Sequence, residues 1–302
     1  MCGIVGLFLK TERHRHELGS LTAAMLHEMR SRGLDSAGFA VYDEGTPDTS
    51  RLTVLAEAQT PNWEPTRAAL ADALSADVDV RPLHDHAVFE TTGDSGVARQ
   101  WIIDNAPDLS VLSHGKQIEL FKSVGDPDLV ASRYDLASRT GTHAIAHTRM
   151  ATESAITTNG SHPFVTGPDT CLVHNGSLSN HHQLREQLVA NGESFQTLND
   201  SEVAAGYLSW RLREGDSIDE ALERALVDLD GFYTFAIGIE NGFAILRDPI
   251  ACKPAVIAET DDWVAMSSEF RAIAQLPGVD DAEVFEPEPA RVYTWSREGV
   301  PA

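Results

Sequence analysis

The sequence opens with MCGIVG, residues Met1–Gly6, and this stretch decides how the rest of the chain is interpreted. Cys2 is small enough for Met1 to be removed, which would leave an α-amine and a thiol on one residue. Their reference pKa values, about 7.7–8.0 and about 8.5, suit proton exchange near neutral pH. Cys2 could therefore supply both a nucleophile and its general base. Residues 4–9 predict a buried strand that would hold this end in place, although an ordinary strand with a buried thiol fits the same residues.

Composition limits the classes of function that the chain can serve. Its 302 residues, 42% of them hydrophobic, suffice for one large domain or two modest ones. A formal net charge of -23 argues against a surface for nucleic acid or an anionic membrane. The three cysteines, an odd and low number, predict a reducing compartment and no disulfide framework. No apolar run has transmembrane length and none resembles a signal peptide, so we expect a cytoplasmic protein.

The secondary-structure signal is mixed from residue 77 to residue 110 and becomes clearer after it. Residues 109–112 and 117–122 predict the two strands of a hairpin. Asp126-Pro127 predicts the start of a helix, as an N-cap followed by a first-turn proline. Histidines are frequent here, but their spacing matches no metal-site template, so no metal ligands are predicted.

Two predicted strands in the middle of the chain end in polar residues. Residues 143–147 predict a strand that leads into Thr148-Arg149, and residues 170–173 predict one that leads into His174-Asn175-Gly176. Asp200 then opens a helix, where an acidic residue is favoured. Asn-Gly is also a common turn dipeptide, and Asp200 also fits a helix cap. Their presence together with an amino-terminal cysteine favours a shared site over separate turns and caps.

A loop with the sequence SRGLDSAG, residues 31–38, follows a predicted helix and precedes a predicted strand. Arg32 and Asp35 either form a solvated ion pair in a turn or help to shape a site beside Cys2. Along the whole chain, helical stretches alternate irregularly with strand pairs. This order favours antiparallel sheets covered by helices over a regular parallel βαβ series. Neither common type of glycine-rich phosphate-binding motif is present.

Taken together, these motifs resemble those of class II glutamine amidotransferases, whose glutaminase domains are N-terminal nucleophile hydrolases. The resemblance implies an α+β fold, a four-layer αββα sandwich. It also implies a single domain over residues 2–302, with an insertion at about 60–140. The matching motifs are Met1–Gly6, Arg32–Gly38, His147–Thr152, His174–Gly176, Asp200–Glu202, Asp230–Tyr233, Arg247–Pro249 and Ser267–Glu269.

The resemblance also implies a role for each residue of the site. Cys2 would attack the side-chain amide of L-glutamine and form a glutamyl thioester, while Asn175 and Gly176 would form the oxyanion hole. Arg149 would hold the substrate α-carboxylate, which its planar fork suits, and Asp200 would hold the α-ammonium group. The remaining residues assigned to the site are Arg32 and Asp35 as supports, His147, and Thr152 as a further hydrogen-bonding group for the substrate.

One residue departs from the family pattern, and the acceptor of the ammonia is not named by any motif. Met150 stands where an aromatic residue, often tryptophan, is usual, which would loosen the wall of the glutamine pocket. Because the sequence ends shortly after the matching motifs, we expect no second domain in this chain that would use the ammonia. It is most similar to separate glutaminase subunits of glutamate synthase and N-methylglutamate synthase type complexes, in which flavin-bearing chains would receive it.

We therefore expect L-glutamine as substrate, a synthase subunit as partner and no cofactor in this chain. Two alternatives remain open. One is a catalytically silent regulatory or scaffolding subunit of such a complex. The other is an N-terminal nucleophile amidohydrolase that acts on a different amide.

Overall fold

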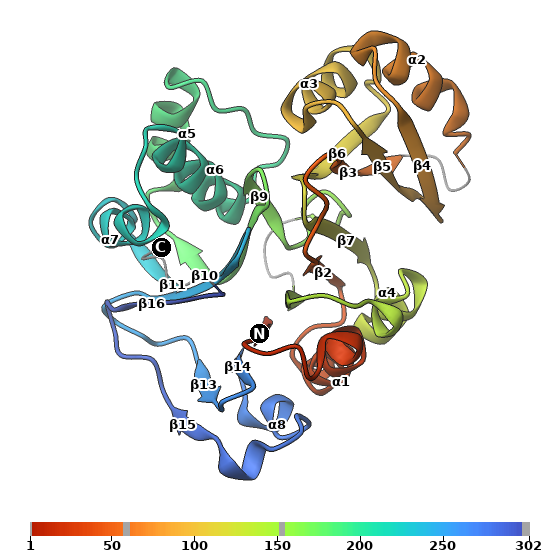
Figure 1. The fold of residues 1–302 in the computed structure, drawn as a ribbon. Coiled ribbons are helices and arrows are strands. Elements are labelled where there is room, and N and C mark those ends of the chain that lie inside the picture. The colour runs from red at the N-terminus through yellow and green to blue at the C-terminus, as the bar shows by residue number, and fades with distance from the viewer. Residues whose placement is uncertain (1, 57–60, 151–154, 298–302) are drawn as a thin grey trace.

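Two antiparallel sheets that pack face to face form the centre of the molecule (Figure 1). The computed structural model describes residues 2–56, 61–150 and 155–297. The larger sheet has seven strands in the order β15-β13-β14-β1-β8-β2-β7. These strands are β1 (Gly3–Leu9), β2 (Ser36–Tyr42), β7 (Ile118–Val124), β8 (His143–Arg149), β13 (Val256–Glu259), β14 (Trp263–Ser267) and β15 (Glu283–Phe285).

The second sheet has five strands in the order β16-β12-β11-β10-β9. These strands are β9 (Phe164–Gly167), β10 (Thr170–Leu178), β11 (Gly231–Ile239), β12 (Gly242–Arg247) and β16 (Val292–Ser296). β11 and β12 pair directly and form a hairpin around Asn241-Gly242.

Helices cover the outer face of each sheet, as Figure 1 shows. On the seven-stranded sheet lie α1 (Leu18–Glu28), α4 (Pro127–Arg133) and α8 (Phe270–Ile273), together with the short turns η1 (Arg15–Glu17), η2 (Arg30–Arg32), η3 (Leu136–Ser138) and η4 (Val279–Asp281). On the five-stranded sheet lie α5 (His181–Ala190), α6 (Asp200–Arg213) and α7 (Ile218–Asp228). The order helix, sheet, sheet, helix is the α+β, four-layer αββα sandwich that was predicted.

Side chains alternate along β1, so that every second residue at the start of the chain points toward the second sheet. In β1, Ile4 and Phe8 lie in the core between the sheets, whereas Val5 packs toward the helices. Successive side chains of a strand point to opposite faces, so the same alternation carried back to Cys2 aims its thiol between the sheets. Because β1 is buried on both faces, its sequence is a continuous apolar run rather than an alternating one.

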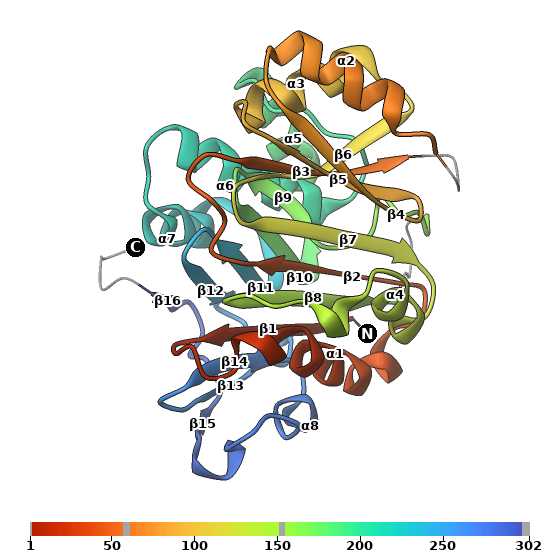
Figure 2. The ribbon, with the colours of Figure 1, turned by 45° about the vertical axis from the view of Figure 1, so that its right-hand side comes forward.

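A third sheet, with its own hydrophobic core, is inserted between β2 and β7 (Figure 2). Its order, β4-β5-β3-β6, and its helix positions match the split βαβ motif. Its elements are β3 (Ser50–Ala56), α2 (Glu64–Leu74), β4 (Val78–Leu83), β5 (His86–Thr91), α3 (Ser95–Asn105) and β6 (Leu109–Gly115). This sheet therefore spans residues 50–115, whereas the insertion was expected at about 60–140; β7 and α4 belong to the main sandwich.

The predicted hairpin over residues 109–122 is wrong in its pairing, although both strands exist. β6 pairs with β3 in the inserted sheet, and β7 pairs with β2 at the edge of the seven-stranded sheet. The local pattern marks two apolar strands around a turn, but it does not show that the chain changes sheets at the turn.

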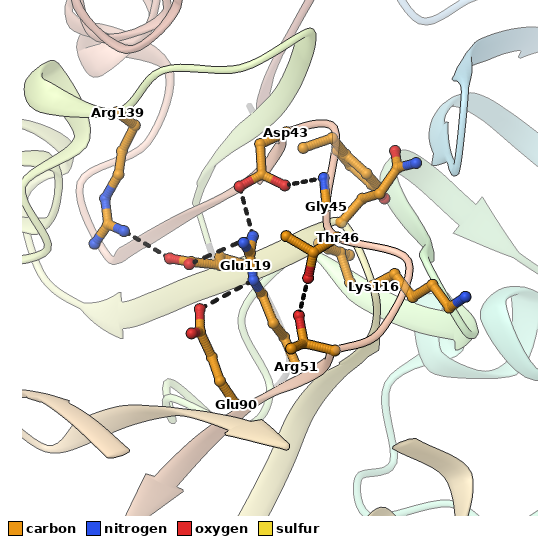
Figure 3. A network of polar contacts seen from close by, with 12 residues as sticks. Asp43, Gly45, Thr46, Arg51, Glu90, Lys116, Glu119 and Arg139 are labelled. Carbon is orange, nitrogen blue, oxygen red and sulfur yellow. Dashed lines mark hydrogen bonds and ion pairs between the residues drawn. The ribbon is translucent and has the colours of Figure 1, made fainter. Parts of the chain in front are cut away.

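An ion-pair network joins the inserted sheet to the main sandwich (Figure 3). Arg51 of β3 contacts Asp43 at 2.5 Å and Glu90 of β5 at 3.1 Å. Glu119 of β7 contacts Arg139 at 2.6 Å and lies 4.0 Å from Arg51. Since Arg51, Glu119 and Arg139 are largely buried, water screens these pairs less than exposed ones. The network therefore helps to hold the insertion against β7.

Candidate active site

Cys2 lies just before β1, at a point where three other segments meet it. Its carbonyl oxygen accepts hydrogen bonds from Arg32 Nε at 2.8 Å and from Asn175 Nδ2 at 3.3 Å. Its Sγ lies 3.9 Å from the carbonyl oxygen of Met150, one residue beyond β8. Antiparallel pairing of β1 with β8 brings these two strand ends together. The cysteine thus lies beside three of the segments that the sequence analysis assigned to one site.

β10 carries Asn175 and Gly176 to the amino-terminal cysteine. The Asn175 side chain is buried between the sheets, where its amide reaches Cys2. Gly176 lies so close to β11 that a Cβ atom there would be 2.0 Å from Phe232 O. A side chain at this position would push β10 away from β11, so the close approach requires glycine. The Asn-Gly pair is part of a strand here and does not form a turn.

Arg32 links Cys2 to a residue that the sequence analysis did not assign a role. Its buried guanidinium lies 2.6 Å, Nη1 to Oε1, from the Glu269 carboxylate. Next to Glu269, Ser268 Oγ accepts a hydrogen bond from Ile4 N–H at 3.0 Å, which holds the start of β1. Glu269 belongs to a matching motif, yet no local signal pairs it with Arg32, because the two lie 237 positions apart.

Arg149 is the last residue of β8, and its side chain is buried. Its Nη1 donates a hydrogen bond to Ala155 O at 3.3 Å. A tight loop packs on its backbone: Asp35 N–H donates to Arg149 O at 3.1 Å, and a Cβ on Gly33 would lie 2.3 Å from the Arg149 carbonyl carbon. The structure thus brings Arg149 and Asp35 together, whereas Thr152 lies outside the described residues.

Asp200 is the first residue of α6 and lies beside the end of β10. Its Oδ2 accepts a hydrogen bond from Leu178 N–H at 2.9 Å. The helix cap is Asn199 instead, because Asn199 Oδ1 accepts a hydrogen bond from Ser201 N–H at 2.9 Å. The capping alternative for Asp200 is therefore excluded, and its role toward an α-ammonium group stays a prediction.

Three buried histidines, His147, His162 and His174, form a cluster next to Asn175. His147 Nε2–H donates to the His174 carbonyl oxygen at 3.0 Å, and the His162 ring lies 4.0 Å from the His147 ring, centre to centre. Burial lowers the pKa of His147 to about 3 and the pKa of His162 well below its ordinary value. These imidazoles are therefore neutral near pH 7. His162 was not predicted, because its loop position carries no periodic signal that places it in a core.

Four ring nitrogens of this histidine cluster have no hydrogen-bond partner among the described residues: His147 Nδ1, His162 Nδ1, His162 Nε2 and His174 Nε2. His174 Nδ1, by contrast, lies 2.8 Å from Ser201 Oγ. Within the described residues, no group of three or more His, Cys, Asp or Glu side chains could hold a metal ion. The described part of the chain also contains no helix with the length and apolar character needed to cross a membrane.

The arrangement is suited to nucleophilic attack on an amide. Cys2 is half-buried, its carbonyl oxygen accepts a hydrogen bond from the Asn175 side-chain amide, and the buried guanidinium of Arg149 belongs to the last residue of the neighbouring strand. Donors fixed at the place where negative charge develops stabilise the tetrahedral intermediate of acyl transfer. A cation beside the nucleophile can hold a carboxylate of the substrate.

Comparison with known proteins agrees with this geometry. A family model described as "Glutamine amidotransferase domain" matches residues 147–275. The glutamine amidotransferase-like protein GlxB of Rhizobium meliloti (strain 1021) is 47% identical over 299 residues, which cover 99% of both chains. A putative glutamine amidotransferase of Methanothermobacter thermautotrophicus is 33% identical over 304 residues, covering 97% of this chain and 99% of that protein.

Solved structures show the same fold in a longer protein. The glutamine phosphoribosylpyrophosphate amidotransferase from B. subtilis superposes with a TM-score of 0.61 and 20% sequence identity. The match covers 99% of this chain but only 50% of that one, so this chain spans half the length of that enzyme. At this identity the likeness concerns the fold alone.

Proposed function

Because the chain belongs to the class II glutamine amidotransferase family, we propose that it acts as a glutaminase subunit that hydrolyses L-glutamine to glutamate and ammonia. The observation that carries the proposal is the contact of Cys2 with Asn175, 3.3 Å from Nδ2 to the cysteine carbonyl oxygen. This contact supports the proposal, because it joins the residue that would carry the nucleophile to the amide that would donate to the oxyanion.

The first half of the proposed reaction forms a thioester. Once Met1 is removed, the α-amine of Cys2 takes the thiol proton, and Sγ forms a bond to the side-chain amide carbon of glutamine. The negative charge moves to the amide oxygen, where Asn175 Nδ2–H and Gly176 N–H donate to it. The carbon–nitrogen bond then breaks, and ammonia leaves with the proton that the α-amine had taken.

The second half releases glutamate. A water molecule gives a proton to the α-amine and attacks the thioester carbon, and the same oxyanion hole holds the charge. The bond from carbon to Sγ then breaks, and Sγ takes the proton from the α-ammonium group, which restores the thiol and the free amine. We propose that Arg149 holds the substrate α-carboxylate and Asp200 its α-ammonium group, with Thr152 as a further hydrogen-bonding group. Arg32, Asp35 and His147 support the site.

A comparison of three proteins tests the proposal. Intact mass first establishes whether Met1 is removed, since a retained Met1 blocks the α-amine. Glutamate release from L-glutamine is then measured for the wild type, for Cys2→Ala and for Asn175→Ala. We expect no turnover with Cys2→Ala and a decrease of about 10²–10³ in kcat with Asn175→Ala. Turnover of other amides but not of glutamine would favour the amidohydrolase alternative. If no amide is turned over, even in the presence of a partner, the silent subunit is favoured.

We further propose that the ammonia passes to a synthase subunit of glutamate synthase or N-methylglutamate synthase type, which carries the flavin, while this chain carries no cofactor and works in the cytoplasm. Exposed apolar side chains beside the site support a partner surface there. They belong to segments that contact the site residues: Leu34, Met150, Phe232 and Phe270. Exposed apolar side chains that form a continuous patch are typical of protein interfaces.

Copurification tests the partner. A tag at the carboxyl-terminal end leaves Cys2 free, and the native complex is then isolated from the source cells. We expect an oxidoreductase chain with a flavin absorbance spectrum to copurify. A negative charge introduced by Phe270→Glu should weaken its recovery, whereas Val227→Glu, at a more exposed apolar position on α7, should leave recovery unchanged.

A further inference from the structure

Lys122 of β7 is a buried residue whose ammonium group donates all of its hydrogen bonds to one loop. Its side chain is 4% exposed. Nζ donates to the carbonyl oxygens of Asn159 at 3.1 Å, Ser161 at 2.8 Å and Pro163 at 3.2 Å. An ammonium group has three N–H donors, so all three are satisfied. Nζ also lies 4.6 Å from the centre of the Phe164 ring, a cation–π distance.

No carboxylate among the described residues forms an ion pair with Lys122. The negative charge of Glu202 acts from outside hydrogen-bonding contact and favours the ammonium form. The Glu202 carboxylate is already bound by the N–H groups of Gln196 and Thr197, each at 2.7 Å. Burial therefore lowers the pKa of Lys122 to about 7. A buried charge that is paired only with carbonyl oxygens is costly to keep, so its place in the fold calls for a function.

The loop that Lys122 holds, residues 155–163, contacts three parts of the candidate site. Ala155 O accepts a hydrogen bond from Arg149 Nη1 at 3.3 Å. The His162 ring packs on His147. Gly160 O accepts from Asn199 Nδ2 at 3.2 Å, and Asn199 directly precedes Asp200. Both residues proposed to bind the ends of the amino acid are thus next to this loop.

The loop packs closely against the sheet at Gly38 of β2. A Cβ atom at Gly38 of β2 would lie 2.2 Å from His162 O and 2.5 Å from Lys122 Cβ. The loop backbone, β2 and the lysine stem are therefore packed against one another. Movement of the ammonium group would move the carbonyl oxygens that it binds, and with them the groups that contact Arg149.

We propose that Lys122 is a positioning residue for the amino-acid substrate, which holds the 155–163 loop so that Arg149 stays in place to bind the α-carboxylate. The proposal rests on the proposed glutaminase function. Lys122 does not touch the reacting atoms, so its loss changes substrate binding more than the chemical step.

Lys122→Met tests the proposal, because methionine keeps the length and the packing of the stem and removes the three donors. Lys116→Met is the matched control: Lys116 is exposed and its Nζ contacts Pro47 O at 3.3 Å, away from the loop. Both variants are compared with the wild type by thermal unfolding, and every later measurement is made well below the melting temperature of the least stable protein.

Hydrogen exchange and steady-state kinetics test the role of Lys122. Hydrogen exchange of the peptide that covers residues 155–163 is expected to become at least about tenfold faster in Lys122→Met and to stay unchanged in Lys116→Met. The KM for L-glutamine is expected to rise about tenfold in Lys122→Met, while kcat changes by less than about threefold. A merely structural lysine would lower the melting temperature and leave the ratio of KM to kcat as it is.

The failures of the two proposals are distinguishable. A wild-type protein that does not hydrolyse glutamine overturns the glutaminase function, while faster exchange of the loop in Lys122→Met still establishes the anchoring by Lys122. Unchanged exchange overturns the anchoring whatever the activity. Faster exchange with an unchanged KM overturns the link from the loop to substrate binding.

Discussion

The substitution Glu269→Gln examines how the amino-terminal cysteine is held. Arg32 donates from Nε to the Cys2 carbonyl oxygen at 2.8 Å and contacts the Glu269 carboxylate through Nη1 at 2.6 Å. The Arg32 side chain is 8% exposed and that of Glu269 is 35% exposed. Glutamine keeps the shape and an accepting oxygen but removes the negative charge that orients the guanidinium.

The magnitude follows from the partial burial of this pair. Hydrogen bonds to charged groups contribute about 1.5–3 kcal/mol to stability. Water reaches a third of Glu269 and glutamine still accepts a bond, so we expect a loss of about 1 kcal/mol. If the same energy is lost from the stabilisation of the transition state because Cys2 is placed less well, kcat falls about fivefold, since 1.4 kcal/mol corresponds to a factor of ten.

Chemical denaturation and steady-state glutamate release measure these two effects separately. The control is Arg271→Met, because Arg271 Nε contacts the other oxygen of the same carboxylate at 2.8 Å but lies outside the path to Cys2. We expect the control to change kcat by less than about twofold, as for most exposed ion pairs. Equal kcat values for Glu269→Gln and the wild type, with the stability loss present, would refute the idea that Glu269 orients the cysteine through Arg32.

Three further predictions follow from the same geometry. Gly176→Ala should decrease kcat by about 10²-fold, because its Cβ would lie 2.0 Å from Phe232 O and displace β10 by about an ångström. A near-normal kcat would contradict the close approach of β10 to β11 at this residue. Glu119→Gln should lower the free energy of unfolding by about 2 kcal/mol, since it weakens the buried contact with Arg139 at 2.6 Å, as denaturation can show. Stability should fall between about pH 6.5 and pH 4, because the pKa values of His143 and His147 are lowered to about 3 in the folded protein, so the unfolded chain binds protons at a higher pH than the folded one. Each histidine lowers the free energy of unfolding by at most about 1.4 kcal/mol per pH unit. Urea titrations at several pH values test this.

Part of the site could be read from the sequence because its chemistry is local. Cys2 follows the first methionine, and Asn175-Gly176 lies at the end of a strand that the apolar pattern predicts. The strand content of β1, β8 and β10 follows from their apolar runs, which are buried on both faces. The roles proposed for Arg149 and Asp200 came from motifs rather than from distances.

Other features depend on contacts that no local pattern contains. The insertion was expected at about 60–140 because the matching motifs leave that stretch uncovered, yet β3 begins at residue 50 and pairs centrally in the third sheet. β6 and β7 lie in different sheets although a short turn joins them. Periodicity shows how a segment is buried, but not which strand pairs with it.

The sequence by itself determined the chemistry of this protein: a cysteine that can carry both thiol and amine, an Asn-Gly pair at the end of a strand, and buried strands in an order that favours packed antiparallel sheets. Only the tertiary structure decided which residues hold that chemistry in place. Glu269 reaches Arg32, and Lys122 reaches the loop at 155–163, across distances in the chain that no repeat or spacing encodes. The physical reason is that the pattern of side chains along the sequence indicates which residues are buried, but not what they pack against. A site forms where segments distant in the sequence pack together, and the packing of the whole chain decides which segments meet.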